Sequence, residues 1–171
     1  MAGKTVNRSD PYARRVWRGH VLDNRTISAL EWAEKRYLRR GTGRKPIRIG
    51  QGSYNTSVDA SAGTHSGGGA VDVMFVGVPD RHRRAWNRWT RKAGFAGWPR
   101  LYPQWAKDNE HWHGLMLGHR NLSSSAQSQI VSWKNGRDGL VGNLLDKYWR
   151  PRRPRRWSHR QNKPIVYKGK G

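Results

Sequence analysis

The sequence contains no cysteine among its 171 residues. This absence excludes a disulfide framework and thiolate chemistry, and it leaves both redox compartments open. No stretch approaches the ~20 apolar residues of a membrane-spanning helix, so we expect no membrane insertion. The first 20 residues are polar and basic, without the apolar run that is typical of a signal peptide.

Carboxylates are scarce as well. Only 11 Asp and Glu residues stand against 34 Lys and Arg residues, which gives a formal net charge of +23. Such a field attracts polyanions: nucleic acid, anionic lipid headgroups or the phosphate-rich polymers of a bacterial envelope. Charge alone does not choose among these partners. Because carboxylates are so scarce, one that occurs together with histidine is informative.

Hydrophobic residues make up only 35% of the chain, yet ten tryptophans and six tyrosines can bury much area per residue. We therefore predict one compact domain over residues 24–146. Residues 1–23 are expected to be a basic, loosely docked arm, and residues 147–171 a cationic tail. Within that tail, PRRPRR at residues 151–156 indicates an extended segment that cannot add to a core.

Apolar periodicity predicts an α+β domain with a small, largely antiparallel sheet flanked by helices. The expected helices run from Asn24 to near Gly41, from Asp80 as a cap to Gly94, and over residues 124–134. The expected strands cover residues 46–51, 70–76 and 111–117. The intervening residues 50–69 are predicted to be a long Gly/Ser-rich loop, and residues 98–108 to be irregular.

A carboxylate in the middle of a predicted strand points to a metal site. Asp72 lies between Val71 and Val73, where a buried and unpaired carboxylate is costly unless a metal ion takes its charge. His65 precedes it by seven residues, across three glycines that let the backbone turn tightly. Positions two apart share a face of a strand, so His111 and His113 can both point at the same metal ion.

Zinc binds imidazole nitrogen and carboxylate oxygen, and a catalytic site needs three protein ligands and an open position for water. His65, Asp72 and His113 supply such a set. Glu110 is then the expected base for the bound water, with His111 as its partner in the transition state, or the reverse. Regular alternation would turn Glu110 away from His113, so its role as base requires a bend or bulge where the strand begins.

The other histidines and the tryptophans have simpler interpretations. The glycine-rich segment lacks the Lys-Ser/Thr pair that follows in a phosphate-binding loop. Trp86 and Trp89, at helical spacing, are expected in the core. Three tryptophans near the site are candidates for lining a substrate groove: Trp98, Trp105 and Trp112. Four histidines are expected to be surface or capping residues: His20, His82, His119 and His159.

Two segments match the halves of one known pattern. Residues 65–72 read HSGGGAVD and fit His-x-x-Gly-x-Ala-x-Asp, and residues 110–113 read EHWH and fit Glu-x-x-His. Together they resemble the zinc D-alanyl-D-alanine carboxypeptidases and dipeptidases of the Hedgehog-like peptidase fold. The likeness extends to residues 51–55 and 94–98, and residues 129–140 look like the closing segment of phage and actinobacterial members.

The resemblance covers about residues 24–146 and implies an endolysin-like member of this fold. It implies Zn²⁺ bound by His65, Asp72 and His113, with Glu110 activating the water. The implied substrates are peptide bonds in the stem peptides or cross-links of peptidoglycan. In the implied chemistry, zinc polarises the scissile carbonyl while the glutamate carries a proton from water to the leaving amine.

One departure from the family concerns substrate binding. Members usually carry an arginine in the turn before the loop, where it binds the substrate carbonyl or carboxylate. Here residues 50–54 read GQGSY, with no arginine after Arg48. Gln51 or Tyr54 can donate a hydrogen bond in its place, though neither brings a charge. Trp112 is the third residue expected to contact the substrate.

Three functions follow from these features. The first is a zinc peptidoglycan peptidase that binds anionic wall polymers through its charge. We expect it to be made in the cytoplasm and released by holin-type lysis or carried in a virion. The second is a structural protein that contacts other virion proteins and keeps the fold with little activity. The third is a nucleic-acid binder, but the cations are dispersed and no nucleic-acid-binding motif appears.

Overall fold

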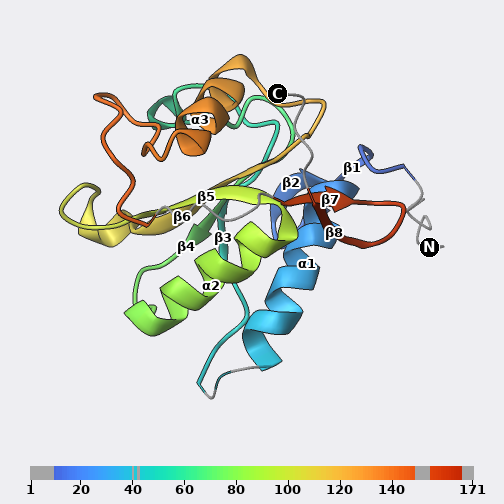
Figure 1. Ribbon diagram of the computed structural model, residues 1–171, viewed down its shortest axis with the longest axis horizontal. Coiled ribbons are helices and arrows are strands. Elements are labelled where there is room, and N and C mark those ends of the chain that lie inside the picture. The colour runs from blue at the N-terminus through green and yellow to red at the C-terminus, as the bar shows by residue number, and fades with distance from the viewer. Residues whose placement is uncertain (1–9, 40, 42, 149–154, 167–171) are drawn as a thin grey trace.

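A four-stranded antiparallel sheet of order β3-β4-β6-β5 forms the centre of the molecule. The computed structural model describes residues 10–39, 41, 43–148 and 155–166. The sheet separates helices α1 and α2, on one face, from helix α3 on the other (Figure 1). The predicted α+β architecture is therefore confirmed. The strands of this sheet are β3 (Ile49–Gln51), β4 (Ala70–Met74), β5 (Phe95–Arg100) and β6 (His111–Met116).

The helices are α1 (Asn24–Arg39), α2 (Asp80–Ala93) and α3 (Ser124–Lys134), close to the predicted ranges. Gly94 ends α2 in the left-handed conformation at φ 100°, as its position after the helix predicted. Ser123 caps α3 by accepting a hydrogen bond from the backbone N–H of Ala126. Asp80 does not cap α2 with its side chain; its carboxylate pairs with Arg84 one turn later. Among the described residues, no helix is long and apolar enough to cross a bilayer.

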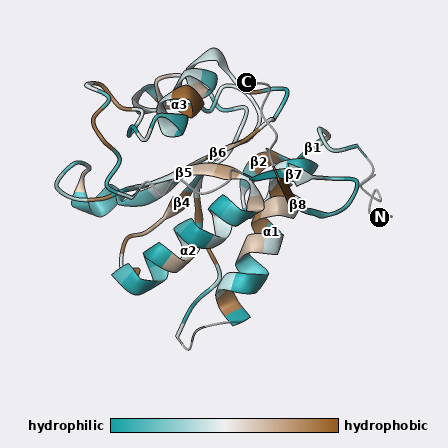
Figure 2. Cartoon of the chain, in the orientation of Figure 1, coloured by the Kyte–Doolittle hydropathy of each residue, from teal (hydrophilic) through white to brown (hydrophobic). Residues whose placement is uncertain are grey.

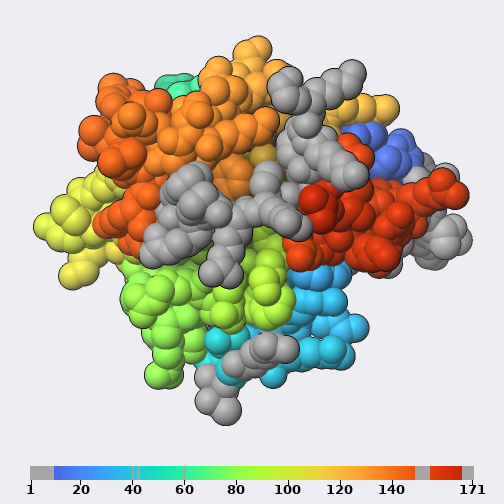
Figure 3. Space-filling model, in the orientation of Figure 1, coloured from blue at the N-terminus to red at the C-terminus, as the bar shows by residue number. Residues whose placement is uncertain are grey.

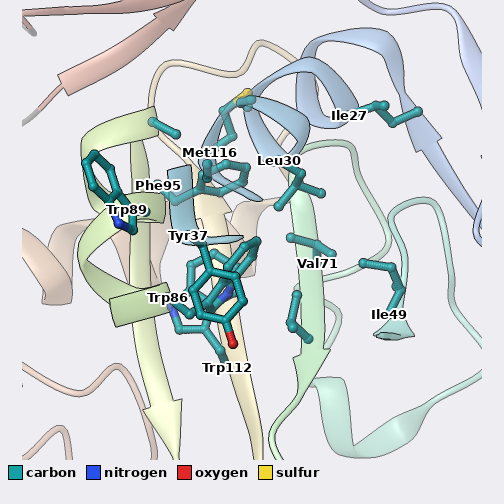
Figure 4. Packing of buried hydrophobic residues seen from close by; sticks show 14 of the residues in the cluster. Ile27, Leu30, Tyr37, Ile49, Val71, Trp86, Trp89, Phe95, Trp112 and Met116 are labelled. Carbon is teal, nitrogen blue, oxygen red and sulfur yellow. The ribbon is translucent and has the colours of Figure 1, made fainter. Parts of the chain in front are cut away.

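The larger core lies between the sheet and the pair α1 and α2. Val71 and Val73 of β4 and Trp112 of β6 point into it, where Trp112 packs edge-on against Trp86 at 5.9 Å between ring centroids. Tyr37 of α1 meets Trp86 in the same way at 5.6 Å. Figure 4 shows these rings gathered between α2 and the strands. Full burial of each apolar side chain contributes roughly 2–3 kcal/mol, so this cluster fixes the position of the central strands.

Strand alternation sends the neighbouring side chains to the other face. Asp72, His111 and His113 therefore emerge on the side of the sheet covered by α3 and its flanking loops. A second, smaller cluster supports that side and includes Trp98, Leu115, Ala126, Ile130 and Trp133. The polar site is thus carried by two central strands whose opposite face is locked in the main core.

Residues 98–100 are not irregular as the sequence predicted, because β5 continues to Arg100 and all of its residues are buried. The sequence FAGWPR does not indicate a strand, because Gly97 and Pro99 are poor strand formers. Pro99 is tolerated because β5 is an edge strand that pairs only with β6. Gly97 leaves space for the indole of Trp112, which a side chain at that position would strike.

The N-terminal arm differs from the prediction where the structure describes it. Residues 1–9 lie outside the described residues. Residues 14–23 are not a loose arm but a hairpin of β1 (Arg14–Trp17) and β2 (His20–Asp23). Leu22 belongs to the main core, and Asp23 is fully buried. These two buried residues hold the hairpin against the core, and they lead directly into α1.

The C-terminal segment also differs from the prediction. Residues 149–154, with the first part of PRRPRR, and residues 167–171 lie outside the described residues. Residues 155–166 form a hairpin of β7 (Arg155–Ser158) and β8 (Lys163–Val166), not an extended tail. Trp157 explains this: it is 1% exposed and packs edge-on against Trp32 of α1. In Figure 3 this hairpin, in red, lies on the surface beside α1 and α2.

Candidate metal centre

Three side chains from the loop before β4, from β4 and from β6 converge on one point. Nε2 of His65, Oδ1 of Asp72 and Nδ1 of His113 form a triangle whose sides measure 3.3, 2.7 and 3.4 Å. Asp72 and His113 are direct cross-strand partners in the β4–β6 register. This buried group of two imidazoles and one carboxylate can hold a metal ion. It comprises the three residues that the sequence predicted as ligands.

Glycines fix the loop that delivers His65. A side chain on Gly67 would strike the backbone of Asn121, and one on Gly68 would strike the ring of His119. The N–H of Gly68 donates to the carbonyl of Asn121 at 2.7 Å. The role of the glycines is therefore to allow close packing of the loop against residues 119–123, rather than to make the loop flexible. His65 is held in turn, because its carbonyl accepts from the N–H of Asn55 at 2.8 Å.

Hydrogen bonds on the far side of each ring set the imidazole tautomers. Nδ1–H of His65 donates to the carbonyl of Gly52 at 2.8 Å, which turns the lone pair of Nε2 toward Asp72. Nε2–H of His113 donates to Oε1 of Gln129 at 3.0 Å and leaves a lone pair on Nδ1. That lone pair faces a carboxylate oxygen of Asp72. A cation at this point removes the repulsion, so the donor set fits a metal ion.

The charge states suit metal binding as well. Burial lowers the pKa of His113 to about 4, so its imidazole is neutral at pH 7. Burial alone would raise the pKa of Asp72, but the neighbouring His113 and His65 hold it well below its usual range. Burial acts against protonation of His65, yet the Asp72 carboxylate raises the pKa of His65 above its ordinary value. The site therefore presents the Asp72 carboxylate between a neutral His113 imidazole and a His65 imidazole that takes up a proton more readily than usual.

His111 lies beside the triangle, as the shared strand face predicted. Its Nε2 is 3.9 Å from Oδ2 of Asp72, and its Nδ1–H donates to the carbonyl of Asn109 at 2.8 Å. The indole of Trp105 packs edge-on against the imidazole at 5.1 Å. The ring is therefore held in place with the lone pair of Nε2 directed at the site, where it can accept a proton.

Glu110 is not at the site. Its Oε2 accepts a hydrogen bond from Nη2 of Arg83 on α2 at 2.6 Å, and its Oε1 accepts from the N–H of Tyr102 at 3.1 Å. The Arg83 guanidinium lowers the pKa of this carboxyl. The backbone at Glu110 is extended, so no bend brings its side chain to the face of His113. The prediction of Glu110 as the base is therefore wrong on geometry, and strand alternation is the reason.

The three residues predicted to contact the substrate lie in different places. Gln51 lines the cavity in front of the triangle, and its buried Nε2 has no hydrogen-bond partner among the described residues. Tyr54 lies behind the loop, where its hydroxyl donates to the buried Asp23 at 3.3 Å. Trp112 is fully buried in the main core and donates to Asn87 at 3.0 Å. The predictions for Tyr54 and Trp112 are wrong; Gln51 is placed to contact a ligand.

The tryptophan and histidine assignments also need correction. Trp98 is buried and stacks on His113 at 5.9 Å, so it supports a predicted metal ligand, whereas Trp105 lines the cavity. His119 is no surface residue: its side chain is fully buried and lies 3.0 Å from Oδ2 of Asp23. His82 is buried against Tyr37. His20 lies at the cavity wall, and His159 lies half-buried in the C-terminal hairpin.

A cavity of about 780 Å³ opens in front of the triangle and has the size of a small-ligand site. Sequence reasoning missed two of its charged residues, Arg100 at the end of β5 and Asp138 in the loop after α3. Arg100 could have been found from its two-residue spacing to Trp98, had residues 98–100 been recognised as a strand. Asp138 carries no comparable signal, because only the fold brings its loop to the sheet.

Compared with known proteins, the chain matches no protein-family model, no curated protein and no solved structure. What the site does is therefore inferred from its own residues.

Proposed function

We propose that the protein is a zinc-dependent peptidase that cleaves peptide bonds in the stem peptides or cross-links of peptidoglycan. One observation carries the proposal: a buried triangle of His65, Asp72 and His113 faces a cavity large enough for a peptide. The resemblance to D-alanyl-D-alanine carboxypeptidases of the Hedgehog-like fold supports it, since the same three residues occupy the ligand positions of that pattern.

Zinc is the metal that suits this donor set best. Four ligands at about 2.0–2.1 Å around a tetrahedral ion lie about 3.3–3.4 Å from one another. The two distances from Nε2 of His65 are 3.3 and 3.4 Å, and the 2.7 Å contact between Asp72 and His113 needs only a small separation. Two imidazoles and one carboxylate leave a fourth position for water, which is the composition of a hydrolytic zinc site.

The chemistry supplied by a bound zinc ion would be polarisation of the scissile carbonyl and acidification of a water molecule. The protein's own residues do the rest. Nε2 of His111, whose lone pair is kept open by the hydrogen bond to Asn109, accepts the proton of the attacking water. It then returns that proton to the leaving amine as the C–N bond breaks. The unpartnered Nε2 of Gln51 donates to a substrate carbonyl.

Anionic wall polymers are the partners that the charge distribution favours. Arg81, Arg84, Arg88 and Lys92 recur every three or four residues along α2 and are exposed, so they form one cationic stripe. Hydrophilic segments recur along this helix in Figure 2. The stripe lies on the face of the sheet opposite the cavity, so a polymer can bind there without covering the site. Release by holin-type lysis or delivery in a virion remains our proposal for how the enzyme reaches the wall.

The deciding experiment is mass spectrometry of fragments released from purified peptidoglycan, with and without chelator. We expect new amino termini or free D-alanine, lost with chelator and restored by zinc. His65→Ala should abolish release while wall binding persists. Release that persists in His65→Ala would overturn the assigned site.

A structural virion protein is the second candidate, and the position of Glu110 favours it. The only carboxylate that the sequence offered as a base is held by Arg83 on the far face of the sheet. Stoichiometric zinc with no peptide release from several wall types would favour this role over the peptidase.

A further inference from the structure

The loop that follows α3 exposes three large apolar side chains close together. Val141 is fully exposed, Leu144 is 64% exposed and Leu145 is 75% exposed. Three of the ten exposed large hydrophobic residues in the described part of the chain thus fall within five positions. In Figure 2 the brown segments of this loop lie at the outer edge of the molecule. Single exposed apolar residues are normal, whereas a group of them marks a surface that meets another molecule or a membrane.

Backbone hydrogen bonds fix the shape of this loop. The N–H of Asp138 donates to the carbonyl of Leu144, and the N–H of Asn143 donates to the carbonyl of Leu140, both at 2.8 Å. Gly142 and Asn143 take φ angles of 90° and 43°, in the left-handed region that these two residue types tolerate best. The loop therefore cannot fold back to bury its apolar tip without breaking these bonds.

The charged residues around the tip separate by sign. Lys134, Arg137 and Lys147 are exposed. The two acidic residues of the segment are turned inward: Asp138 is buried, and the side chain of Asp146 is 3% exposed and pairs with a guanidinium on α2 at 3.3 Å. Every exposed charge from residue 134 to residue 147 is therefore positive.

We propose that residues 134–147, the docking loop, bind the protein to the surface of an anionic phospholipid bilayer. Val141, Leu144 and Leu145 enter the boundary between headgroups and acyl chains, where apolar side chains leave water. The three exposed cations stay at the level of the lipid phosphates, which attract them. No described helix is long and apolar enough to cross a bilayer, so the contact is superficial.

The same features argue against a second copy of the chain as the partner. Two copies that each carry a net charge of +23 repel each other. A stable protein interface also uses roughly 20–30 residues a side, more than this loop offers. An anionic bilayer needs only a small apolar tip, because charge attraction adds to the burial of the tip.

Docking also sets the orientation of the cavity. Val141 and Leu144 line it, so the docked loop places that side of the cavity next to the bilayer. The cationic stripe on α2 lies on the opposite face of the sheet and stays open to anionic polymers. The inference does not rest on the peptidase function, and its test is a binding measurement.

The absence of cysteine allows a direct test in the full chain. Val141→Cys carries one environment-sensitive fluorophore, and Val16→Cys is the control, since Val16 is 71% exposed on β1 at the other end of the molecule (Figure 1). The vesicles contain equal parts of phosphatidylglycerol and phosphatidylcholine, or phosphatidylcholine alone. The label at residue 141 should shift to the blue and be quenched by brominated acyl chains on the anionic vesicles only. The label at residue 16 should do neither.

Vesicle sedimentation measures the apolar contribution while the charge is held constant. The double variant Val141→Ser, Leu145→Ser should lower the partition coefficient on anionic vesicles at least about tenfold, because two apolar side chains no longer leave water. The matched double variant Val16→Ser, Val166→Ser removes two exposed valines elsewhere and should leave the partition coefficient unchanged.

Equal partitioning of the two double variants would overturn the proposal, because adsorption would then follow net charge alone. Failure of the unmodified protein to bind anionic vesicles, or an equal response of the two labels, would overturn it as well. A blue shift at residue 141 that appears without vesicles and grows with protein concentration would assign the loop to a contact between copies instead of a bilayer.

Discussion

Nδ1 of His113 lies 2.7 Å from Oδ1 of Asp72, across a register in which the two residues are direct partners. The other ring nitrogen of His113 is occupied by Gln129. Two acceptor atoms thus meet inside the protein, and the arrangement is favourable only with a cation or proton between them. Binding of a metal ion at this point would therefore be coupled to folding.

The first prediction concerns that coupling. Zinc at a thousandfold excess over its Kd should stabilise the folded protein by about 4 kcal/mol, because it binds the folded site only. Chelator should reverse the gain in a thermal unfolding scan. His65→Ala should abolish both the shift and the one-to-one stoichiometry. His20→Ala, at the cavity wall but outside the triangle, is the matched control and should keep both. An undiminished shift in His65→Ala would show that the metal binds elsewhere.

The second prediction concerns pH in the metal-free protein. The folded-state pKa of His113 is about 4, below the unfolded value of about 6.5. Between these values the unfolded chain binds the proton and the folded chain does not, so the free energy of unfolding falls as pH falls. The loss is on the order of 2–4 kcal/mol.

His65 acts in the opposite sense, because its folded-state pKa is raised. Its contribution is present below pH 6.5 and is lost as pH rises through the folded value. Denaturant unfolding at pH 4, 6.5 and 8 should therefore show the metal-free protein most stable near pH 6.5. His113→Gln should flatten the acid side of that profile. An acid side that stays equally steep in this variant would assign it to another group.

The third prediction separates His111 from Glu110. His111→Gln should lower kcat by roughly 10²–10⁴-fold, as loss of a proton-transfer group does, and leave zinc stoichiometry intact. Glu110→Gln should leave kcat within a fewfold and instead cost about 1–3 kcal/mol of stability, because Arg83 loses its charged partner. Single-turnover rates and denaturant unfolding of both variants check this. A large kcat loss in Glu110→Gln with normal stability would restore the role that the sequence predicted.

The sequence predicted the metal triangle because two of its members sit on strands with clear alternation. Val71 and Val73 mark the buried face of β4, so Asp72 must face the other way, and His113 follows from the same logic on β6. The same alternation already argued against Glu110. The sequence motif favoured Glu110 as the base, and the backbone geometry decided against it.

Two features were missed in the sequence because their partners are distant. Arg100 becomes part of the site only once β5, with its glycine and proline, pairs with β6. Trp157 stands among arginines and has no apolar neighbour in sequence; its partner Trp32 is 125 residues earlier on α1. Local sequence patterns predict where strands and helices lie. A single buried residue in a polar segment can be recognised only when the surface against which it packs is known.

The fourth prediction follows from that contact. Trp157→Ala should destabilise the protein by about 3–5 kcal/mol, because a fully buried indole between α1 and α2 is removed. Arg155→Ala, at the exposed first residue of the same strand, should change stability by less than about 0.5 kcal/mol. Chemical denaturation of both variants measures this. A Trp157→Ala variant as stable as the Arg155→Ala control would mean that residues 155–166 are not docked as described.

The last prediction concerns the cationic stripe on α2. Changing Arg81, Arg84 and Arg88 to Gln should weaken binding to walls that carry anionic polymers and reduce its dependence on salt, because three exposed charges leave one face. Hydrolysis of a small peptide should be unchanged, since the cavity lies on the other side of the sheet. A control that removes equal charge uses three exposed cations outside the stripe: Lys107, Arg120 and Lys134.

Binding of the stripe and control variants is measured by sedimentation with walls before and after chemical removal of the anionic polymers. If only the stripe variant loses binding, and only on untreated walls, the stripe is the polymer site. Equal losses in the two variants would mean that net charge alone directs binding. Salt-sensitive binding to duplex DNA that the stripe variant loses while its wall binding stays intact would move the partner from wall polymers to nucleic acid.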